Sequence, residues 1–355
     1  MKTSEFSFEL PENLIAQYPP EKRGQSRLLV MDRKNGCFEH RMVKDLPSIL
    51  DPGTLLVFNN SRVRRARLFG VSTASGTNAE FFLLKKLDDL SWQAMAKRSG
   101  RKRPGSIYVF DDIKGEIVSA TDAEAGKGLS PGAEAEKGVL VLRFEKPIDD
   151  AWLDIHGHVP LPPYIRRGDV CEDRERYQTV FAAEYGSAAA PTAGLHFTGE
   201  LLKELEMAGI ETAFITLHVG PGTFLPVRTE DLEKHKMHEE AYSIGDETAD
   251  RIEKAKAGGR KVIAIGTTSV RTMESAWMEE EGILRRGEGN TSIFIYPGYI
   301  FKVTDAIFTN FHTPLSTLLM LVSAFAGRDF IMECYKEAVR AGYRFYSYGD
   351  ACLIL

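Results

Sequence analysis

The stretch Lys261-Val-Ile-Ala-Ile-Gly-Thr-Thr-Ser-Val-Arg-Thr272 decides the fold class of this 355-residue chain. Its first five residues form a short apolar run that is typical of a buried strand, and the glycine and hydroxyl residues that follow can open a helix. A similar order occurs upstream, where a helix predicted to begin after Thr198 ends at Gly209 and leads into a strand over 210–217. Alternating strands and helices predict an α/β domain with a parallel sheet.

A different pattern of apolar and polar residues begins at about residue 62. Short alternating or β-branched runs, separated by turn residues, replace the helical period at 63–68, 80–84, 92–96, 106–110, 116–120 and 139–144. Such runs favour a small antiparallel barrel. Because a buried strand, Thr54-Leu-Leu-Val-Phe58, precedes the runs and the α/β pattern returns after Ala151, we predict an α/β core domain (1–61 and 153–355) with an inserted β-barrel domain (62–152).

Composition excludes several classes of protein. The chain is 43% hydrophobic and 27% charged, and its four cysteines have no paired spacing, so a disulfide framework, a zinc ribbon and an iron–sulfur cluster are not expected. The N-terminus lacks a signal-peptide pattern, and the apolar run 315–326 is too short to span a bilayer and predicts a buried helix. We therefore expect a cytoplasmic protein without membrane contact.

The chain has a formal net charge of −5, but some of its basic residues are concentrated in two short stretches of sequence. Basic residues gather in two groups, one around Arg62, Arg64 and Arg65 and the other around Arg101, Lys102 and Arg103. Each group is either a solvated face or a phosphate-binding site, and two dense groups on an acidic chain favour phosphate binding.

Four short segments concentrate reactive and conformationally special residues. They are Pro191-Thr-Ala-Gly-Leu-His-Phe-Thr198, His218-Val-Gly-Pro-Gly-Thr-Phe-Leu-Pro-Val227, Gly266-Thr-Thr-Ser-Val-Arg-Thr272 and Asn310-Phe-His-Thr-Pro-Leu-Ser-Thr317. Three carry a histidine, and each lies beside a predicted strand end or helix start, where α/β folds gather their sites. We predict one active site assembled from four loops.

Two of the segments suggest ligand contacts, and each has a simpler alternative. Free N–H groups and three hydroxyls converge at Gly266-Thr-Thr-Ser269, which suits a carboxylate or phosphate, with Arg271 one turn further; the alternative is ordinary helix capping. Gly220 and Gly222 would let a flat ligand approach the backbone; the alternative is a tight Pro-Gly turn.

Histidines at 235–238 and 156–158 have no third metal ligand at a recognisable spacing, so no metal is expected.

The order of motifs resembles the S-adenosylmethionine:tRNA ribosyltransferase-isomerase family of bacterial queuosine biosynthesis. The resemblance runs essentially end to end, through Phe8-Glu-Leu-Pro-Glu-Asn-Leu-Ile-Ala-Gln17, Ser26-Arg-Leu-Leu-Val30, Asn59-Asn-Ser-Arg-Val63, Pro160-Leu-Pro-Pro-Tyr-Ile165, the four segments, His235 to Glu240, Ile295-Tyr-Pro-Gly298 and Tyr343-Arg-Phe-Tyr-Ser-Tyr-Gly-Asp-Ala351. The architecture that the resemblance implies, an α/β domain carrying an inserted barrel, agrees with the division predicted above.

The resemblance implies that S-adenosylmethionine is consumed as a ribosyl donor and that no cofactor is tightly bound. The implied acceptor is 7-aminomethyl-7-deazaguanine at the wobble position of the tRNAs for aspartate, asparagine, histidine and tyrosine, and adenine and methionine leave. This chemistry needs bases for the aminomethyl group and the 5′ carbon and an acid near adenine, roles that suit histidine near pH 7. The chain is expected to act as a monomer.

The implied site residues fall into three sets. The expected acids and bases are His196, His218, His312, His238, Glu240 and Asp350. The expected substrate contacts are Thr192, Gly194, Gly220, Gly222, Thr223, Thr267, Thr268, Ser269, Arg271 and Asn310. The expected tRNA contacts are Arg62, Arg64, Arg65, Arg101, Lys102 and Arg103.

Two other functions compete with this one. A different S-adenosylmethionine-dependent tRNA-modifying transferase would share the cofactor, but a methyltransferase would need a Gly-x-Gly loop after its first strand, which the sequence lacks, and a radical enzyme would need a cysteine triad, which is also absent. A non-catalytic tRNA-binding protein would have no need of four polar loops, and release of free adenine would exclude it.

Overall fold

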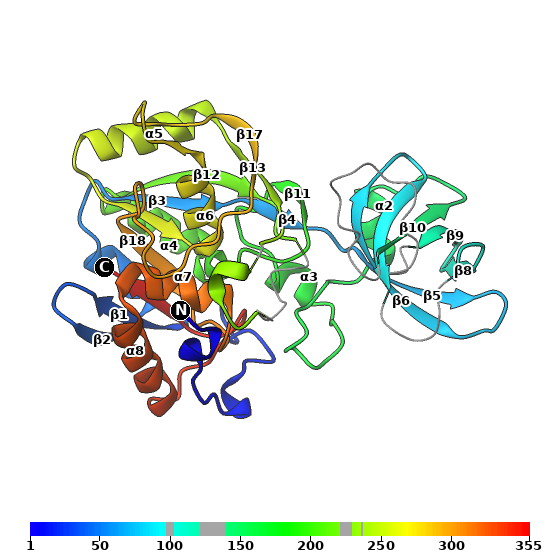
Figure 1. Ribbon diagram of the computed structural model, residues 1–355, viewed down its shortest axis with the longest axis horizontal. Coiled ribbons are helices and arrows are strands. Elements are labelled where there is room, and N and C mark those ends of the chain that lie inside the picture. The colour runs from blue at the N-terminus through cyan, green and yellow to red at the C-terminus, as the bar shows by residue number, and fades with distance from the viewer. Residues whose placement is uncertain (97–102, 121–138, 221–228, 236) are drawn as a thin grey trace. The chain divides into compact units, whose positions relative to one another are not determined.

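The computed structural model describes residues 1–96, 103–120, 139–220, 229–235 and 237–355. The chain divides into two compact units, one formed by Met1–Arg62 with Pro162–Leu355 and the other by Val63–Leu161 (Figure 1). The first contains a large sheet with helices, and the second contains a closed six-stranded barrel. The predicted fold class, an α/β core with an inserted antiparallel β-barrel, is confirmed.

The sheet of the first unit has nine strands in the order β17-β13-β12-β3-β14-β18-β19-β1-β2. Their bounds are β1 Arg27–Asp32, β2 Cys37–Met42, β3 Leu55–Asn59, β12 Glu211–Leu217, β13 Glu240–Ile244, β14 Val262–Ile265, β17 Gly287–Thr291, β18 Ala306–Asn310 and β19 Ala351–Ile354. Strands β12, β3, β14 and β18 are parallel, but β13, β17, β2 and the β18–β19 pair run antiparallel to their neighbours. The sheet is therefore mixed, and the prediction of a parallel sheet holds for its centre.

Strand β3 joins the part of the chain before the barrel to the part after it. Val57 lies opposite Ala213 of β12 on one side and Ala264 of β14 on the other. All five residues of β3 are buried, as expected for a central strand whose two faces are both covered. The α/β core is thus built from segments that are far apart in sequence.

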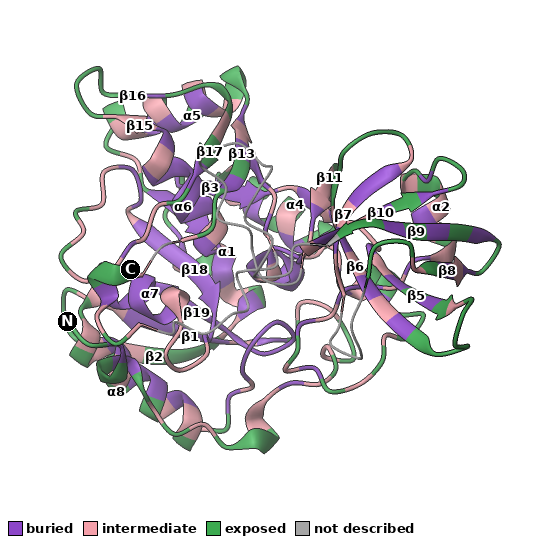
Figure 2. Cartoon of the chain, turned by 45° about the vertical axis from the view of Figure 1, so that its right-hand side comes forward, coloured by how far each residue is buried: buried purple, intermediate pink, exposed green. Residues whose placement is uncertain are grey.

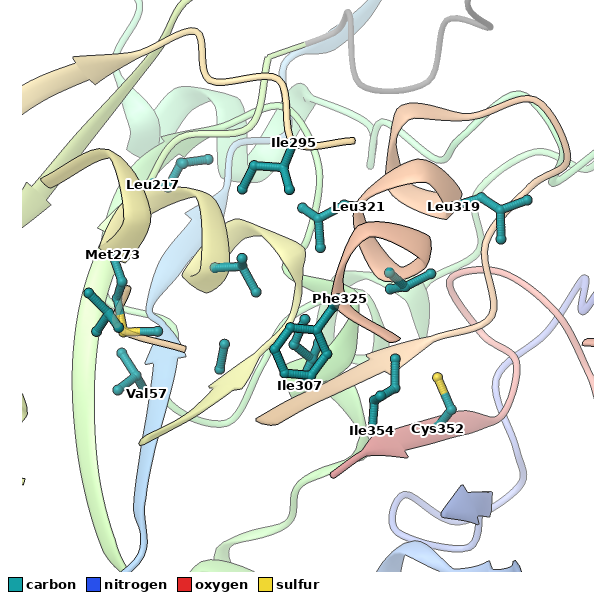
Figure 3. Close-up of a cluster of buried hydrophobic side chains, with 14 of the residues drawn as sticks. Val57, Leu217, Met273, Ile295, Ile307, Leu319, Leu321, Phe325, Cys352 and Ile354 are labelled. Atoms are coloured by element: carbon teal, nitrogen blue, oxygen red, sulfur yellow. The ribbon is translucent and has the colours of Figure 1, made fainter. Parts of the chain in front are cut away.

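Helices cover both faces of this sheet (Figure 2). They are α1 Leu46–Ile49, α3 Asp173–Arg176, α4 Gly199–Met207, α5 Asp246–Ala257, α6 Thr267–Ala276, α7 Thr317–Ala326 and α8 Arg328–Arg340, with the 3-10 turns Thr3–Phe6, Glu12–Leu14, Val43–Asp45, Thr192–His196 and Leu232–Lys234. Helices α5, α6, α7 and α8 pack on one face, and α1, α4 and the turn at 192–196 pack on the other. Figure 3 shows the first of these cores, where Met273 of α6 and Phe325 of α7 lie over the sheet with Val57 and Ile307.

Local sequence explains where several helices begin and end. The Thr198 hydroxyl accepts a hydrogen bond from the Leu201 N–H at 3.0 Å and so caps α4, and Gly209, with φ of +77°, follows the end of that helix. The apolar run 315–326 forms the buried helix α7, as predicted. Helix α1 is short and is preceded by the 3-10 turn Val43–Asp45, because Pro47 has no N–H to bond to the carbonyl of Val43.

The barrel of the second unit has the strand order β10-β7-β6-β5-β8-β9 and closes on itself. Its strands are β5 Arg67–Ser72, β6 Asn78–Lys86, β7 Ser91–Ala96, β8 Ile107–Phe110, β9 Ile113–Ala120 and β10 Val139–Phe144, and α2 Asp150–His156 follows them. Its interior is filled by its own cluster, which includes Phe81, Trp92, Phe110 and Phe144. The first barrel strand begins at Arg67, four residues later than predicted.

Strands β4 Ser61–Val63, β11 Glu184–Ser187, β15 Trp277–Met278 and β16 Ile283–Leu284 lie outside the two main sheets. No helix in the described parts of the chain is long and apolar enough to cross a membrane. Cys37 and Cys171 are exposed thiols, whereas Cys334 and Cys352 are buried.

Candidate active site

A cavity of about 250 Å³ lies at the carboxyl ends of the central parallel strands. Strands β12, β14 and β18 end at Leu217, Ile265 and Asn310, and the chain that follows each of them contributes to the cavity wall. Residues from all four segments line it: Pro191, Thr192, Ala193, Val219, Gly266, Thr267, Thr268, Asn310, Phe311, His312, Thr313, Pro314 and Ser316. The carboxyl edge of a parallel sheet is the usual ligand site of an α/β fold.

Asn310 presents an unused acceptor at the cavity wall. Its amide nitrogen lies 3.0 Å from Nε2 of His196 and donates to the carbonyl of Tyr346 at 3.1 Å. These two contacts fix the orientation of the amide, and Oδ1 is buried without a hydrogen-bond partner among the described residues. A buried acceptor left unsatisfied is costly, so Oδ1 is placed to receive an N–H or O–H from a ligand.

His196 accepts a hydrogen bond from the Asn310 amide and helps to fix its orientation. Its Nδ1 lies 2.9 Å from the Ser26 hydroxyl, and with Nε2 accepting from Asn310 the ring carries its proton on Nδ1. Burial, and next the positive charge of Arg23, lower the pKa of His196 to about 4, so the ring is neutral at pH 7. Both nitrogens are occupied, which suits a residue that orients Asn310.

His312 lines the cavity directly. Its Nε2 lies 3.1 Å from the Thr309 hydroxyl, and its backbone N–H donates to the Tyr335 hydroxyl at 3.0 Å. Nδ1 has no hydrogen-bond partner within the described part of the chain. Burial lowers the pKa of His312 to about 3, so the imidazole is uncharged at neutral pH. A neutral ring beside the cavity does not repel a cationic ligand.

The N-terminus of α6 forms another part of the wall. Gly266 has φ of +90°, a backbone conformation that favours glycine at the turn into α6. Thr267 and Thr268 line the cavity, and the Thr268 hydroxyl is buried with no partner among the described residues. Ser269 is fully buried, and its hydroxyl donates to the Ile265 carbonyl at 2.9 Å.

A buried ion pair connects α6 to the second segment. The Arg271 guanidinium contacts the Glu240 carboxylate, and both side chains are about 95% buried. Oε1 of Glu240 accepts a hydrogen bond from the Gly220 N–H at 2.9 Å. The pair therefore holds the beginning of the Gly-Pro-Gly loop. Nε and Nη2 of Arg271 are buried and have no partner among the described residues.

The other predicted acids and bases lie in different surroundings. His218 follows β12 and lines a separate hollow with Thr216, Tyr242 and Asn290, and His238 is exposed. Asp350 is buried, and its two oxygens accept hydrogen bonds from the backbone N–H groups of Arg27 and Arg344, each at 2.8 Å. Burial raises the pKa of Asp350. The structure thus brings His312 and Asn310 to one cavity, and it does not place His218, His238 or Asp350 in its wall.

Some predicted contacts lie outside the described residues, namely Gly222, Thr223, Arg101 and Lys102. Of the remaining substrate residues, Thr192 lines the cavity, whereas Gly194 is packed so closely that a Cβ would lie 2.7 Å from the Thr179 methyl group.

The described basic residues predicted to bind tRNA differ in their partners. Arg64 contacts Asp150 at 2.5 Å, and Arg65 lies 3.7 Å from the Asp154 carboxylate. Arg62 lies over the Tyr185 ring at 4.6 Å, and Arg103 is exposed.

The cavity wall also contains polar and aromatic side chains that are not among the predicted site residues, including Tyr164, Tyr346 and Ser347. The Tyr164 hydroxyl lies 2.6 Å from the Ser347 hydroxyl, and the Tyr164 and Tyr346 ring centroids are 4.5 Å apart. Tyr346 has φ of +73°, an uncommon conformation for a bulky residue that often marks a functional site. Tyr346 and Ser347 lie in the aromatic motif Tyr343–Tyr348 and Tyr164 lies in Pro160–Ile165, two motifs whose positions in the fold the sequence did not reveal.

Among the residues that the structure describes, no group of three or more His, Cys, Asp or Glu side chains is arranged to hold a metal ion.

Comparison with known proteins shows the family of this chain. Residues 3–354 match the family described as queuosine biosynthesis protein. Relatives called S-adenosylmethionine:tRNA ribosyltransferase-isomerase, from Treponema denticola and Clostridioides difficile, are 51% and 47% identical to the chain, and each match covers 100% of both sequences. A crystal structure of S-adenosylmethionine tRNA ribosyltransferase from Thermotoga maritima is 35% identical, with a TM-score of 0.55 and coverage of 99% of this chain and 100% of that one. The chain belongs to the family of queuosine biosynthesis proteins.

Proposed function

We propose that the chain is an S-adenosylmethionine:tRNA ribosyltransferase-isomerase. It transfers the ribosyl moiety of S-adenosylmethionine to 7-aminomethyl-7-deazaguanine at the wobble position of tRNA and isomerises it, which gives epoxyqueuosine-tRNA. A bond forms to the aminomethyl nitrogen, and the bonds from the ribosyl group to adenine and to the methionine sulfur break. The observation that carries this proposal is the full-length match to relatives of that name, with one cavity lined by all four segments.

The cavity can meet several demands of this reaction. Oδ1 of Asn310 can accept a hydrogen bond from an N–H of adenine or of the acceptor amine, and His196 positions it as described above. His312 is neutral, so it can take up a proton without first having to lose one, although its low pKa makes it a weak base until a ligand alters its surroundings. The N–H groups and hydroxyls at the start of α6 suit the methionine carboxylate.

The remaining parts of the proposal concern partners and location. S-adenosylmethionine is a consumed substrate, and no cofactor is tightly bound. The acceptors are the aspartate, asparagine, histidine and tyrosine tRNAs, whose phosphates contact Arg62, Arg64, Arg65, Arg101, Lys102 and Arg103. The protein works in the cytoplasm as a monomer.

The test follows adenine and methionine separately, with tRNA that carries the aminomethyl base as the acceptor. Equal release of the two products, with the ribosyl group retained on the tRNA, is expected. His312→Ala should lower turnover by roughly 10²-fold or more if the ring acts as an acid or base. Formation of S-adenosylhomocysteine would identify a methyltransferase instead, and tRNA binding without adenine release would identify a non-catalytic binding protein.

A further inference from the structure

A small hollow adjoins the cavity on the far side of His196. It is lined by residues that include Arg23, Ser26, Arg176, His196, Ser347 and Tyr348. Ser347 also lines the cavity, and His196 is hydrogen-bonded to Asn310 of the cavity wall. The hollow has a volume of about 20 Å³, which is room for one oxygen-sized group and too little for a base or a sugar.

Two guanidinium groups meet at this hollow without a neutralising carboxylate. Nη2 of Arg23 donates to the Glu175 carbonyl at 3.1 Å, and Arg176 donates to the carbonyls of Glu21 and Pro20 at 3.2 and 2.5 Å. Neither side chain forms an ion pair within the described residues. Burial, and next the positive charge of Arg176, lower the pKa of Arg23, which indicates that the two cations are close enough to repel each other.

Several other partly or fully buried arginines have a carboxylate partner, in the pairs Arg64–Asp150, Arg67–Glu80, Arg167–Asp173, Arg260–Glu211 and Arg271–Glu240. Arg27, Arg33 and Arg62 are partly buried without an ion pair among the described residues, but each of these three guanidinium groups lies over an aromatic ring. Nη1 of Arg23 is, in addition, buried without any hydrogen-bond partner among the described residues. A buried donor on an uncompensated cation is costly in the free protein, and an anion would remove both costs.

We propose that Arg23 and Arg176 bind a substrate oxyanion, which we assign to a backbone phosphate of the tRNA. The assignment rests on the proposed function. Guanidinium groups offer planar, paired donors that match phosphate oxygens, and a phosphate held at this hollow would fix the tRNA backbone beside the cavity. The carboxylate of S-adenosylmethionine has the same chemistry and is the competing source.

The experiment compares Arg23→Gln with Arg174→Gln in the full-length protein. Arg174 lies on the same short helix as Arg176 and is exposed, so its replacement removes the same charge without touching the hollow. The dissociation constant for acceptor tRNA is measured over a series of KCl concentrations without S-adenosylmethionine, and the KM for S-adenosylmethionine is measured separately. Thermal unfolding checks that each variant is folded.

Arg23→Gln should weaken tRNA binding about tenfold and flatten the log–log salt dependence by about 0.7 to 0.9 for the lost phosphate contact. Arg174→Gln should change neither quantity to that extent. A raised KM for S-adenosylmethionine with parental tRNA affinity would assign the hollow to the donor carboxylate and overturn the phosphate assignment. Parental values of both quantities in folded Arg23→Gln would overturn the oxyanion site altogether.

Two controls keep the outcome interpretable. If Arg23→Gln does not fold, Arg23→Lys decides: its tRNA affinity should fall while the salt slope stays close to the parental one, because an ammonium keeps the charge but loses the paired donors. Parental affinity of Arg23→Lys for both substrates would then overturn the oxyanion site. Adenine release by the parent protein tests the proposed function independently. A parent that releases adenine while Arg23→Gln and Arg23→Lys bind both substrates normally would contradict this inference alone.

Discussion

At the scale of single residues, the two buried histidines beside the cavity make stability depend on pH. Burial lowers the pKa of His196 to about 4 and that of His312 to about 3, from an ordinary value of 6.5. Between pH 6.5 and these values the unfolded chain binds protons that the folded chain does not, so the free energy of unfolding falls as pH falls. Above about pH 6.5 both states are neutral at these positions, and the stabilising difference is fully present.

We expect the parent protein to lose about 2.5 kcal/mol of unfolding free energy for each histidine when the pH is lowered from 7.5 to 4.5. Urea unfolding at pH 7.5 and at pH 4.5 measures the loss. His312→Asn removes one of the two groups and should reduce the difference in unfolding free energy between pH 7.5 and pH 4.5. His238→Asn is the control, since that side chain is exposed. An identical pH dependence in His312→Asn and the parent would contradict the burial argument.

The sequence predicts that the four segments meet, but it does not predict the individual contacts within the site. The meeting of the four segments was predictable, because three of them follow strands that end at one edge of a parallel sheet. The individual contacts were not, since His196 depends on Ser26 and Asn310, which are 170 and 114 residues away in sequence. Tyr346 was equally hidden, because its positive φ is imposed by tertiary contacts such as its N–H bond to the Phe311 carbonyl.

At the scale of elements, short-range patterns determine most strands and helices, but the order of strands in the sheet depends on distant pairings. The predicted strands over 54–58, 210–217 and 261–265 correspond to β3, β12 and β14. By contrast, β19 at the C-terminus lies between β18 and β1, and the polar strand β17 pairs with β13. A sequence such as Gly287-Glu-Gly-Asn-Thr291 has no strand periodicity, so only its partner makes it a strand.

The Glu240–Arg271 pair tests how strongly three elements depend on one another, since it joins β13, α6 and the loop after β12. Glu240→Gln should lower the free energy of unfolding by about 3 kcal/mol, because it leaves a buried guanidinium without its counter-charge. Arg271→Met should cost a similar amount. The double variant Glu240→Gln with Arg271→Met should cost clearly less than the sum of the two.

Urea unfolding at pH 7.5 measures all three variants of this cycle. Arg251→Met is the matched control, because Arg251 forms an exposed pair with Glu247 and its loss should cost less than about 1 kcal/mol. Additive losses in the double variant would mean that the buried pair does not couple these elements.

At the scale of the whole molecule, the barrel and the α/β core have separate interiors. The barrel core is made of its own residues, such as Phe81, Trp92 and Phe144, and the core clusters of the sheet draw on residues before Arg62 and after Leu161. We propose that the inserted domain, predicted over 62–152, is separable from the core. Val63–Leu161, the unit that the structure gives, is the segment to remove.

Replacing Val63–Leu161 by a short Gly/Ser linker should leave an α/β core that unfolds cooperatively in urea, because β3 still pairs with β12 and β14. Binding of acceptor tRNA should weaken strongly and lose part of its salt dependence, since Arg64, Arg65 and the basic group at 101–103 leave with the barrel. The core should still bind S-adenosylmethionine, as the described wall of the cavity belongs entirely to the α/β unit. Calorimetric titration with S-adenosylmethionine and tRNA measures both affinities. A shortened chain that is insoluble would show that the barrel completes the core, and a folded core that binds tRNA as tightly as the parent would remove the barrel from tRNA recognition.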